Sequence, residues 1–415
     1  MYKVFKFGGA SVKDAEGVKN LKKIIDIYKD EKLIIIISAM GKMTNQLEKL
    51  LDVWYNDPKS IESNFEIVKN YHLNIAQQLD NTGEITTVLI PILDRLYEIL
   101  SGAHSNHYDK DYDDIVSFGE YLSTKLISTY LNLNGFVHKF ACAINLVKTD
   151  DSFREGKIDW EETEKLICEF VAKHSNKTII TQGFLGGTTK GEVTTLGREG
   201  SDFSAAIFAY CLNAKEVTIW KDVPGLLNAD PKFYPDAIKL DKISYQEAIE
   251  LAYYGATIIH PKTLKPLQNK NIPLFVKSFL APSEEGSIIS DVESLEKTPS
   301  YIFKTEQILL SIFPKDFSFI AADNLRKIFS YISKNKLKIN LMQNSALSFT
   351  ICMDSKSNRF SNLLKDLEGE FSVKYNMNKK LITIRHYTQE AIEKVIGNQL
   401  IILEQKSRST LQVVL

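Results

Sequence analysis

Residues 1–41 follow a strand, glycine turn, helix, strand pattern that leaves few folds open. Residues 4–7 predict a short strand, Gly8 and Gly9 a turn, and residues 15–29 a helix with apolar side chains on one face. Residues 33–37 are apolar without interruption, as expected for a parallel strand that helices cover on both faces. This β-α-β unit predicts an α/β fold with an open, mainly parallel sheet.

Later strands end in the same kind of polar, glycine-bearing loop. Residues 178–181 lead into a Gln-Gly-Phe turn that ends at Phe184, and residues 217–220 lead into Lys221, Asp222 and Gly225. The carboxyl ends of parallel strands meet at one edge of the sheet, and ligands bind at that edge in open α/β folds. We therefore expect these loops to lie together around a ligand.

The stretch TTLGREGSDFSA, residues 194–205, carries the strongest single indication of a site. Its glycines allow a tight turn, and Ser201 or Asp202 is a good N-cap for the helix that the following apolar run predicts. The start of a helix favours an anion, and Arg198 fits a carboxylate or phosphate. Asp202 suits an ammonium group or a metal. The stretch indicates a pocket for a zwitterion beside a phosphate, and the alternative is a turn that only caps a helix.

Two further charged residues have open interpretations. Lys6 lies two residues before Gly8, where it could reach a ligand, or it could be a solvated edge lysine like Lys3. Glu120 starts an apolar-periodic helix, where it could favour the helix dipole or hold an ammonium group. Position alone does not decide either case.

Residues 45–130 predict a mostly helical insertion that contains a run of histidines and aspartates. Asp109, Asp111, Asp113 and Glu120 match four positions of a calcium loop, but Asp114 stands where that loop requires glycine, so we exclude it.

Three histidines were considered for other roles. His104 and His107 lack a third ligand and are expected to be surface residues. His260, before a proline and between two helices, is expected to be structural.

Composition excludes several classes of function. The formal net charge of −1 gives no electrostatic case for binding nucleic acid or membranes. The four cysteines form no CxxC pair, which favours a reducing compartment. The N-terminal residues do not resemble a signal peptide, and no apolar run is long enough to span a bilayer. We expect a cytoplasmic protein.

The pattern changes near residue 301. Residues 281–300 are rich in Ser, Glu and Pro and predict a linker. Residues 308–375 follow a β-α-β-β-α-β order, the ferredoxin-like unit, and residues 381–415 look like a shortened second copy. We predict a main domain over 1–280, a linker over 281–300 and a paired C-terminal region over 301–415.

With these stretches placed, the whole chain resembles the aspartate kinases of the amino acid kinase family. The motifs KFGGAS, SAMGKMTNQL, SFGE, QGF, TTLGREGSD, KDVPGLLNADPK and LAYYGATIIHPKTL follow the family's order and spacing. The resemblance implies a three-layer αβα kinase domain followed by two ACT units, the second of them truncated. It implies ATP-dependent phosphorylation of the aspartate side chain with Mg²⁺, the first step of lysine, threonine and methionine biosynthesis. The alternative is a catalytically silent amino-acid sensor. We expect no homoserine dehydrogenase half, because the chain ends at Leu415.

The resemblance also implies roles residue by residue. The residues expected to hold aspartate are Ser38, Thr44, Glu120, Phe184, Arg198, Glu199, Gly200, Ser201 and Asp202. Those expected to bind ATP are Lys6, Gly8, Gly9, Ser11, Lys221, Asp222, Gly225, Leu227, Lys232, Thr257 and Ile258, and no protein metal ligand is assigned. Catalysis is assigned to Lys6, Glu120, Arg198 and Asp202. The chain departs from the family at Ala10, Glu199, Lys221, Leu227, Lys232 and Thr257.

The C-terminal region implies regulation and association. ACT units commonly pair between chains, so a homodimer or larger assembly is expected. Asn340, Gln343, Asn344 and Ser345 match positions where relatives hold an amino-acid effector. Asn340 replaces the aspartate of lysine-sensitive relatives, so we predict a weak response to lysine or none.

Overall fold

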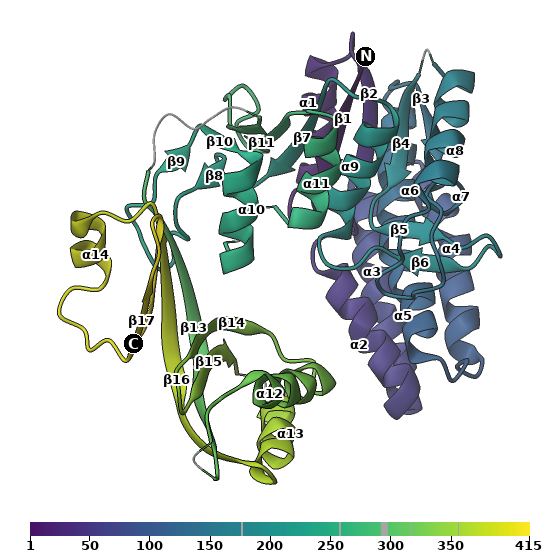
Figure 1. Ribbon diagram of the computed structural model, residues 1–415. Coiled ribbons are helices and arrows are strands. Elements are labelled where there is room, and N and C mark those ends of the chain that lie inside the picture. Colours follow the sequence, from purple (N-terminus) through teal and green to yellow (C-terminus); the bar gives the residue numbers. More distant parts are fainter. Residues whose placement is uncertain (176, 257–258, 292–297, 317, 356) are drawn as a thin grey trace. The chain divides into compact units, whose positions relative to one another are not determined.

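A computed structural model describes residues 1–415 except 176, 257–258, 292–297, 317 and 356. The chain divides into two compact units, each with its own sheet (Figure 1). The first unit comprises residues 1–226, 239–249 and 259–294, and the second comprises residues 227–238, 250–258 and 295–415. Residues 227–238 and 250–258 thus leave the first unit for the second.

The first unit is built on an eight-stranded sheet in the order β10-β12-β11-β7-β1-β2-β4-β3. Its neighbouring strands run parallel except for the β11–β12 pair. The strands are β1 Tyr2–Phe7, β2 Lys32–Ile37, β3 His138–Ala141, β4 Thr178–Gln182, β7 Glu216–Lys221, β10 Lys242–Ser244, β11 Leu274–Ser278 and β12 Ser287–Ser290. The parallel sheet predicted from residues 1–41 is confirmed.

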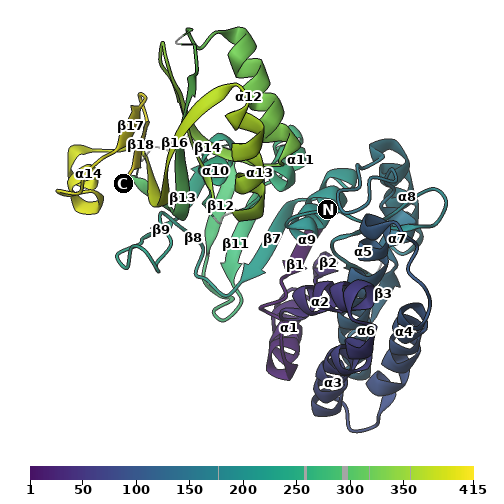
Figure 2. The same cartoon turned by 90° about the horizontal axis from the view of Figure 1, so that it is seen from below.

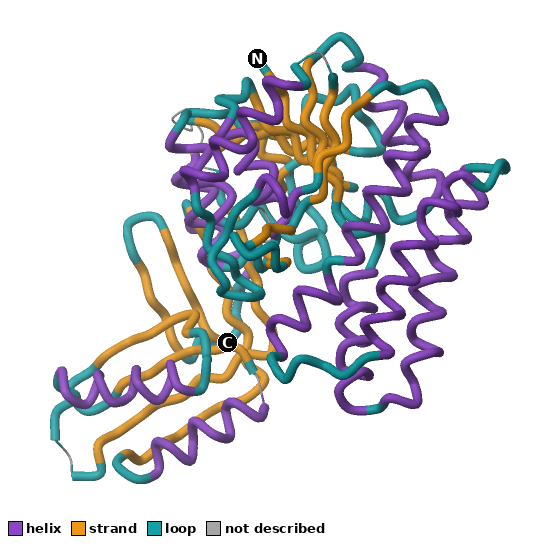
Figure 3. Tube along the Cα trace, turned by 90° about the vertical axis from the view of Figure 1, so that its right-hand side faces the viewer, coloured by secondary structure: helices purple, strands orange, loops and turns teal. Residues whose placement is uncertain are grey.

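Both faces of the central strands are buried because residues alternate between two helical layers. Phe5 and Phe7 of β1 join a core with α1 (Ala15–Ile27) and α6 (Phe118–Leu133), while Val4 and Lys6 take the opposite face, against which α9 (Gly200–Cys211) packs. In Figure 2, α1 and α9 lie on opposite sides of β1 and β2, and Figure 3 shows the orange strands between purple helices. Lys6 therefore faces α9.

Residues 43–133 are almost entirely helical. They form α2 Met43–Asn56, a short 3-10 helix at Pro58–Ser60, α3 Ile61–Leu79, α4 Glu84–Ser101, α5 Tyr108–Val116 and α6. Apolar side chains such as Leu47, Leu89 and Leu96 are fully buried in the same core as α1. Four further helices follow along the chain: α7 Ala143–Leu146, α8 Trp160–Lys173, α10 Tyr245–Tyr254 and α11 Pro261–Asn269. The two minor sheets pair β5 Leu185–Gly187 with β6 Val193–Thr195, and β8 Leu226–Leu227 with β9 Lys239–Leu240.

The predicted linker over residues 281–300 is wrong in its first half. Ser287–Ser290 form β12, which pairs with β10 and β11 inside the main sheet. Ile289 is fully buried there. The surrounding Ser, Glu and Pro residues hide this short strand in the composition, because only its two isoleucines carry the β pattern.

The second unit carries a six-stranded antiparallel sheet in the order β14-β15-β13-β16-β18-β17. Its elements are β13 Ser300–Pro314, α12 Ala322–Lys334, β14 Ile339–Asn344, β15 Phe349–Asp354, α13 Ser357–Glu368, β16 Phe371–Arg385, α14 Gln389–Val395, β17 Leu403–Lys406 and β18 Thr410–Val414. Separate apolar clusters lie on its two halves, one with α12 and α13 and one with α14.

The two halves of this sheet share strands, which the sequence pattern did not predict. Residues 371–375 and 381–385 read as separate strands but belong to one strand, β16, which pairs with β13 along its length. The polar residues between them suggest a turn. Instead, the β13–β16 pairing shifts register between Lys304 and Leu309, near Glu306 with φ of 53° and Asn378 with φ of 55°. An irregularity of this kind bends a strand without ending it.

Among the described residues, no helix has the length and apolar character that crossing a membrane requires. The same residues contain no group of three or more His, Cys, Asp or Glu side chains placed to hold a metal ion.

Candidate active site

The turn after β1 brings backbone rather than side chains to the sheet edge. The Gly8 carbonyl accepts the amides of Ser11 and Val12 at 3.0 and 3.2 Å, and the Gly9 carbonyl accepts the Gly41 amide at 2.9 Å. A Cβ at Gly9 would lie 2.5 Å from the Ala39 carbonyl oxygen, too close for any side chain. Glycine at position 9 is therefore required by packing against the loop after β2.

A left-handed residue opens the helix that follows β6. Gly197 and Glu199 have φ of 76° and 54°, and α9 begins at Gly200. Ser201 and Asp202, predicted as N-caps, instead lie inside the first turn, because Glu199 takes the cap position. The Glu199 carboxylate accepts the His260 amide at 2.9 Å rather than an amide of α9. Backbone carbonyls accept most of the first amides of α9: the Gly200 amide donates to the Gly197 carbonyl at 3.0 Å, and the Asp202 and Phe203 amides donate to the Glu199 carbonyl at 3.0 and 3.1 Å.

Phe184 and Gly200 fix the approach of this turn to the end of β4. The Phe184 amide donates to the Ser204 hydroxyl at 2.9 Å, and a Cβ at Gly200 would lie 2.5 Å from the Phe184 ring. Lys262 donates to the Leu196 carbonyl at 3.0 Å. Three residues predicted to bind aspartate therefore lie together, although they are distant in the sequence: Phe184 after β4, and Gly200 and Ser201 at the start of α9.

A buried ion pair joins β1 to α9. Lys6 Nζ lies 2.6 Å from Asp202 Oδ1, and the two side chains are only 11% and 4% exposed. Burial raises the pKa of Asp202, but the charges of Lys6 and Lys221 outweigh it and hold this pKa below its usual value. Asp202 is therefore ionised at neutral pH. The structure thus pairs Asp202 with Lys6, a contact that the sequence interpretation of Asp202 as a site for an ammonium group or a metal does not include.

Glu120 is buried at the start of α6 and lies close to the same edge. Its Oε1 accepts the Ala39 amide at 3.2 Å, and its Oε2 has no hydrogen-bond partner among the described residues. Burial raises the pKa of Glu120 to about 8, against the opposing effects of the Ala39 amide and the Lys6 charge. A carboxyl group so placed gains a great deal from a cation that reaches its second oxygen.

The other residues of the first unit that are expected to bind substrates lie at or just after the ends of the strands, and they differ in how exposed they are. Ser38 is buried, and its amide donates to the Phe7 carbonyl at 3.2 Å, while Thr44 is half-buried in the first turn of α2. The Ser11 hydroxyl donates to the Trp220 carbonyl at 3.3 Å, so it braces the turn against β7. Lys221 is half-buried and Asp222 is exposed after β7.

Arg198 is exposed in the turn between Gly197 and Glu199. It takes no part in the buried ion pair and stands four residues before Asp202.

Gly225, with φ of 156°, packs against Ser287, whose hydroxyl would lie 2.4 Å from a Cβ at position 225.

The remaining predicted ATP residues do not belong to the described part of the first unit. Leu227 and Lys232 belong to the second unit, where the Lys232 amide donates to Asp230 at 2.9 Å. Thr257 and Ile258 lie outside the described residues.

The expected effector residues lie in the second unit, with Asn340 near the start of β14, Gln343 and Asn344 at its end and Ser345 just after it. The Asn340 side chain accepts from Lys304 at 2.6 Å and donates to Gln307 at 2.8 Å and Asp354 at 2.7 Å. Gln343 and Asn344 are exposed, and Ser345 turns the chain towards Ser348.

The sequence analysis missed one residue that supports the site. Asp113 was considered only as a calcium ligand, yet it is fully buried in α5 and bonded to Thr195. Its position four residues before the SFGE motif was the available signal. Two of the histidine interpretations agree with the structure: His107 is exposed, and His260 accepts the Lys262 amide at 3.2 Å. The expectation that His104 is a surface residue is wrong, because His104 is half-buried and its ring stacks on Tyr55 with the ring centres 4.1 Å apart.

Comparison with known proteins gives a consistent family. Residues 1–278 match the model of the amino acid kinase family. The chain is 31% identical to aspartokinase 2, chloroplastic, of Arabidopsis thaliana, over 94% of this chain and 76% of that protein. It is 28% identical to lysine-sensitive aspartokinase 3 of Escherichia coli, over 85% of this chain and 78% of that protein.

Solved structures agree. Aspartokinase III of E. coli in complex with lysine and aspartate is 25% identical, with a TM-score of 0.84 over 100% of this chain and 95% of that one. The same enzyme with aspartate and ADP is 24% identical, with a TM-score of 0.85 over 100% and 96%, and supports the fold.

Proposed function

The chain belongs to the amino acid kinase family, within its aspartokinases, and from this premise we propose how it phosphorylates the side-chain carboxylate of L-aspartate with ATP. The observation that carries the proposal is the buried Lys6–Asp202 pair, where β1 meets the start of α9. A lysine side chain that an ion pair holds at the N-terminus of a helix is suited to a phosphoryl group. The product is 4-phospho-L-aspartate, an acyl phosphate.

Aspartate needs no general base, because its side-chain carboxylate is already ionised at neutral pH. Catalysis then consists of positioning and of stabilising charge on the transferred phosphoryl group. We assign the stabilisation of that charge to Lys6 and to the backbone amides of Gly8 and Gly9. Asp202 orients Lys6 through the ion pair.

The amino acid is held through its two α-substituents. The unpartnered oxygen of Glu120 takes the ammonium group, and Arg198 takes the α-carboxylate through its planar fork. Thr44, Ser38 and Ser201 stand near these groups as hydrogen-bonding residues. Binding in this way directs the side-chain carboxylate of the substrate towards Lys6.

Under this proposal, Mg²⁺ binds together with ATP. Magnesium is commonly held by one or two carboxylates together with substrate phosphates, and no larger acidic cluster exists among the described residues. Asp222, exposed at the end of β7, fits as the protein ligand. The ion neutralises phosphate charge. Lys221, Leu227 and Lys232 are proposed nucleotide contacts, while the second unit is proposed as the regulatory and dimerising part.

Hydroxylamine trapping tests this function. Purified protein with ATP, Mg²⁺ and aspartate forms aspartyl hydroxamate if the acyl phosphate is made. Glutamate in place of aspartate controls for substrate class. Absence of hydroxamate with aspartate would overturn the proposal.

A further inference from the structure

Asp113 is a buried carboxylate that the proposed chemistry does not use. It lies on α5, is fully buried and accepts three hydrogen bonds. The donors are the Thr195 hydroxyl at 2.6 Å, the Thr195 amide at 3.0 Å and the Arg154 amide at 2.8 Å. A carboxylate that accepts three bonds holds its donors more strongly than a neutral acceptor.

The donors lead directly to the substrate turn. Thr195 ends β6 and stands three residues before Arg198. Its carbonyl accepts the Gly156 amide at 2.9 Å, which ties the 154–156 loop to the same strand. A Cβ at Gly197 would lie 3.1 Å from Glu155, so the turn packs closely on that loop. Asp113 thus holds both segments that support Arg198.

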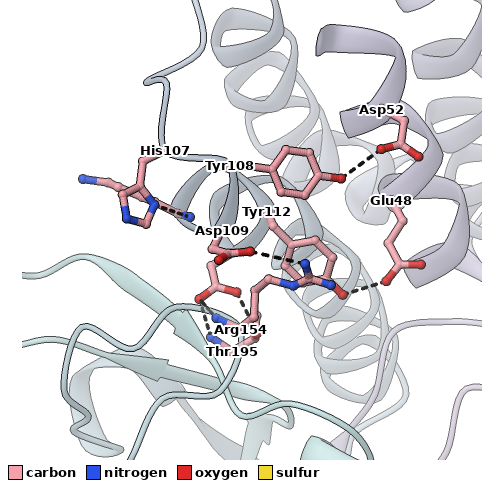
Figure 4. Close-up of polar contacts among 10 residues, drawn as sticks. Glu48, Asp52, His107, Tyr108, Asp109, Tyr112, Arg154 and Thr195 are labelled. Carbon is pink, nitrogen blue, oxygen red and sulfur yellow. Dashed lines mark hydrogen bonds and ion pairs between the residues drawn. The ribbon is translucent and has the colours of Figure 1, made fainter. Parts of the chain in front are cut away.

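The helix that carries Asp113 is itself fixed to the aspartate-binding side. Tyr112 donates to Glu48 at 2.7 Å and Tyr108 to Asp52 at 2.9 Å, both on α2 (Figure 4). The Arg154 guanidinium lies 4.2 Å from the centre of the Tyr112 ring and 3.2 Å from Asp109. These contacts anchor α5 at several points.

The chain order gives this anchoring a consequence. α5 ends at Val116 and α6 begins at Phe118, two residues before Glu120. One short, anchored helix therefore connects the carboxylate assigned to the substrate ammonium with the turn assigned to its α-carboxylate. A shift of Thr195 relative to α5 changes the distance between those two groups.

We propose that Asp113 is a positioning residue that sets the spacing between Glu120 and Arg198 and so fixes recognition of the α-amino acid. This inference rests on the proposed function. Asp113 does not touch the substrate, and its effect passes through Thr195. Loss of the bond therefore weakens aspartate binding and leaves ATP binding nearly unchanged.

Four variants test the proposal. Thr195→Val removes the hydroxyl donor, and Thr195→Ser retains it as the conservative rescue. Asp113→Asn removes the charge. Tyr108→Phe removes a different hydrogen bond from the same helix and is the matched control. Thr195→Val and Asp113→Asn are expected to raise the KM for aspartate about tenfold or more, the scale of one lost bond to a charged group. The KM for ATP changes by less than about twofold, and Thr195→Ser and Tyr108→Phe stay near the parent.

Amide hydrogen exchange separates this inference from the proposed function. Exchange at residues 195–200 is expected to quicken about tenfold in Thr195→Val and to stay unchanged in Thr195→Ser, whether or not the parent protein forms hydroxamate. An inactive parent with this exchange pattern refutes the function and supports the positioning. If Asp113→Asn fails to fold, Thr195→Val alone decides. A lower melting temperature with unchanged KM for aspartate and unchanged exchange overturns the inference.

Discussion

Replacing Lys6 with methionine tests the buried pair at the centre of the site. The two charges, 2.6 Å apart, attract by about 6 kcal/mol at an effective dielectric constant of about 20. Desolvation opposes this gain, and removing one partner of a buried pair costs about 3–5 kcal/mol. Because the Lys221 charge also acts on Asp202, we expect a loss near the lower end, about 3 kcal/mol.

The Lys6→Met substitution is expected to lower kcat as well as the free energy of unfolding. Lys6→Met removes charge that the transferred phosphoryl group needs, so kcat is expected to fall at least 100-fold, about the effect of removing one positioned donor. Hydroxamate formation at saturating ATP and aspartate measures kcat, and urea unfolding measures stability. The double variant Lys6→Met/Asp202→Asn should regain most of the stability and none of the activity.

Lys3→Met is the matched control, because Lys3 lies on the same strand. Lys3 Nζ is 2.9 Å from Glu31, which is 40% exposed, and 3.5 Å from Glu216, which is 18% exposed, so water solvates both remaining partners better than it solvates Asp202, which is 4% exposed. A small loss of stability and an unchanged kcat are expected. The reasoning is refuted if Lys6→Met keeps kcat within about threefold of the parent, or if the double variant is as unstable as the single one.

Three further predictions concern other parts of the chain. Gly9→Ala forces a Cβ onto two backbone oxygens and is expected to lower the free energy of unfolding by about 1–3 kcal/mol, whereas Gly8→Ala meets only the flexible end of one side chain; equal losses in urea unfolding would contradict this. Glu120, with a pKa of about 8, is protonated at pH 7 without substrate, so binding an ammonium group lowers its pKa and releases up to one proton, which calorimetry in buffers of different ionisation enthalpy detects; Glu120→Gln should abolish the release. The same raised pKa means that Glu120 favours folding below about pH 4.5 and that this contribution is lost as pH rises through about 8. Lysine is expected to inhibit weakly or not at all, because the Asn340 side chain is already bonded to Lys304, and strong inhibition by lysine alone in a titration against threonine would contradict this.

The main sheet was predictable because β1 and β2 carry strong local patterns. Leu33 to Ile37 are apolar at every position, and the structure buries all of them. The ion pair between Lys6 and Asp202 was not predictable in this way, since their side chains meet across 195 intervening positions and no local pattern encodes that contact. Tertiary packing decides it.

The start of α9 and the long strand β16 show where local rules failed. Ser201 and Asp202 have good capping propensity, but the left-handed Glu199 begins the helix earlier. In β16, residues 376–380 are polar except for Met377 and suggest a turn, yet the pairing of Asn376 and Lys379 with β13 carries the strand through them. Both errors arise because hydrogen bonds to distant segments outweigh local preference.

A crystal structure of the protein with aspartate and a non-hydrolysable ATP analogue tests the account most directly. The account predicts the α-carboxylate at Arg198, the ammonium group at Glu120 and the terminal phosphate within hydrogen-bonding distance of Lys6 Nζ. Aspartate bound away from Arg198 and Glu120, or a terminal phosphate that Lys6 does not contact, would contradict it.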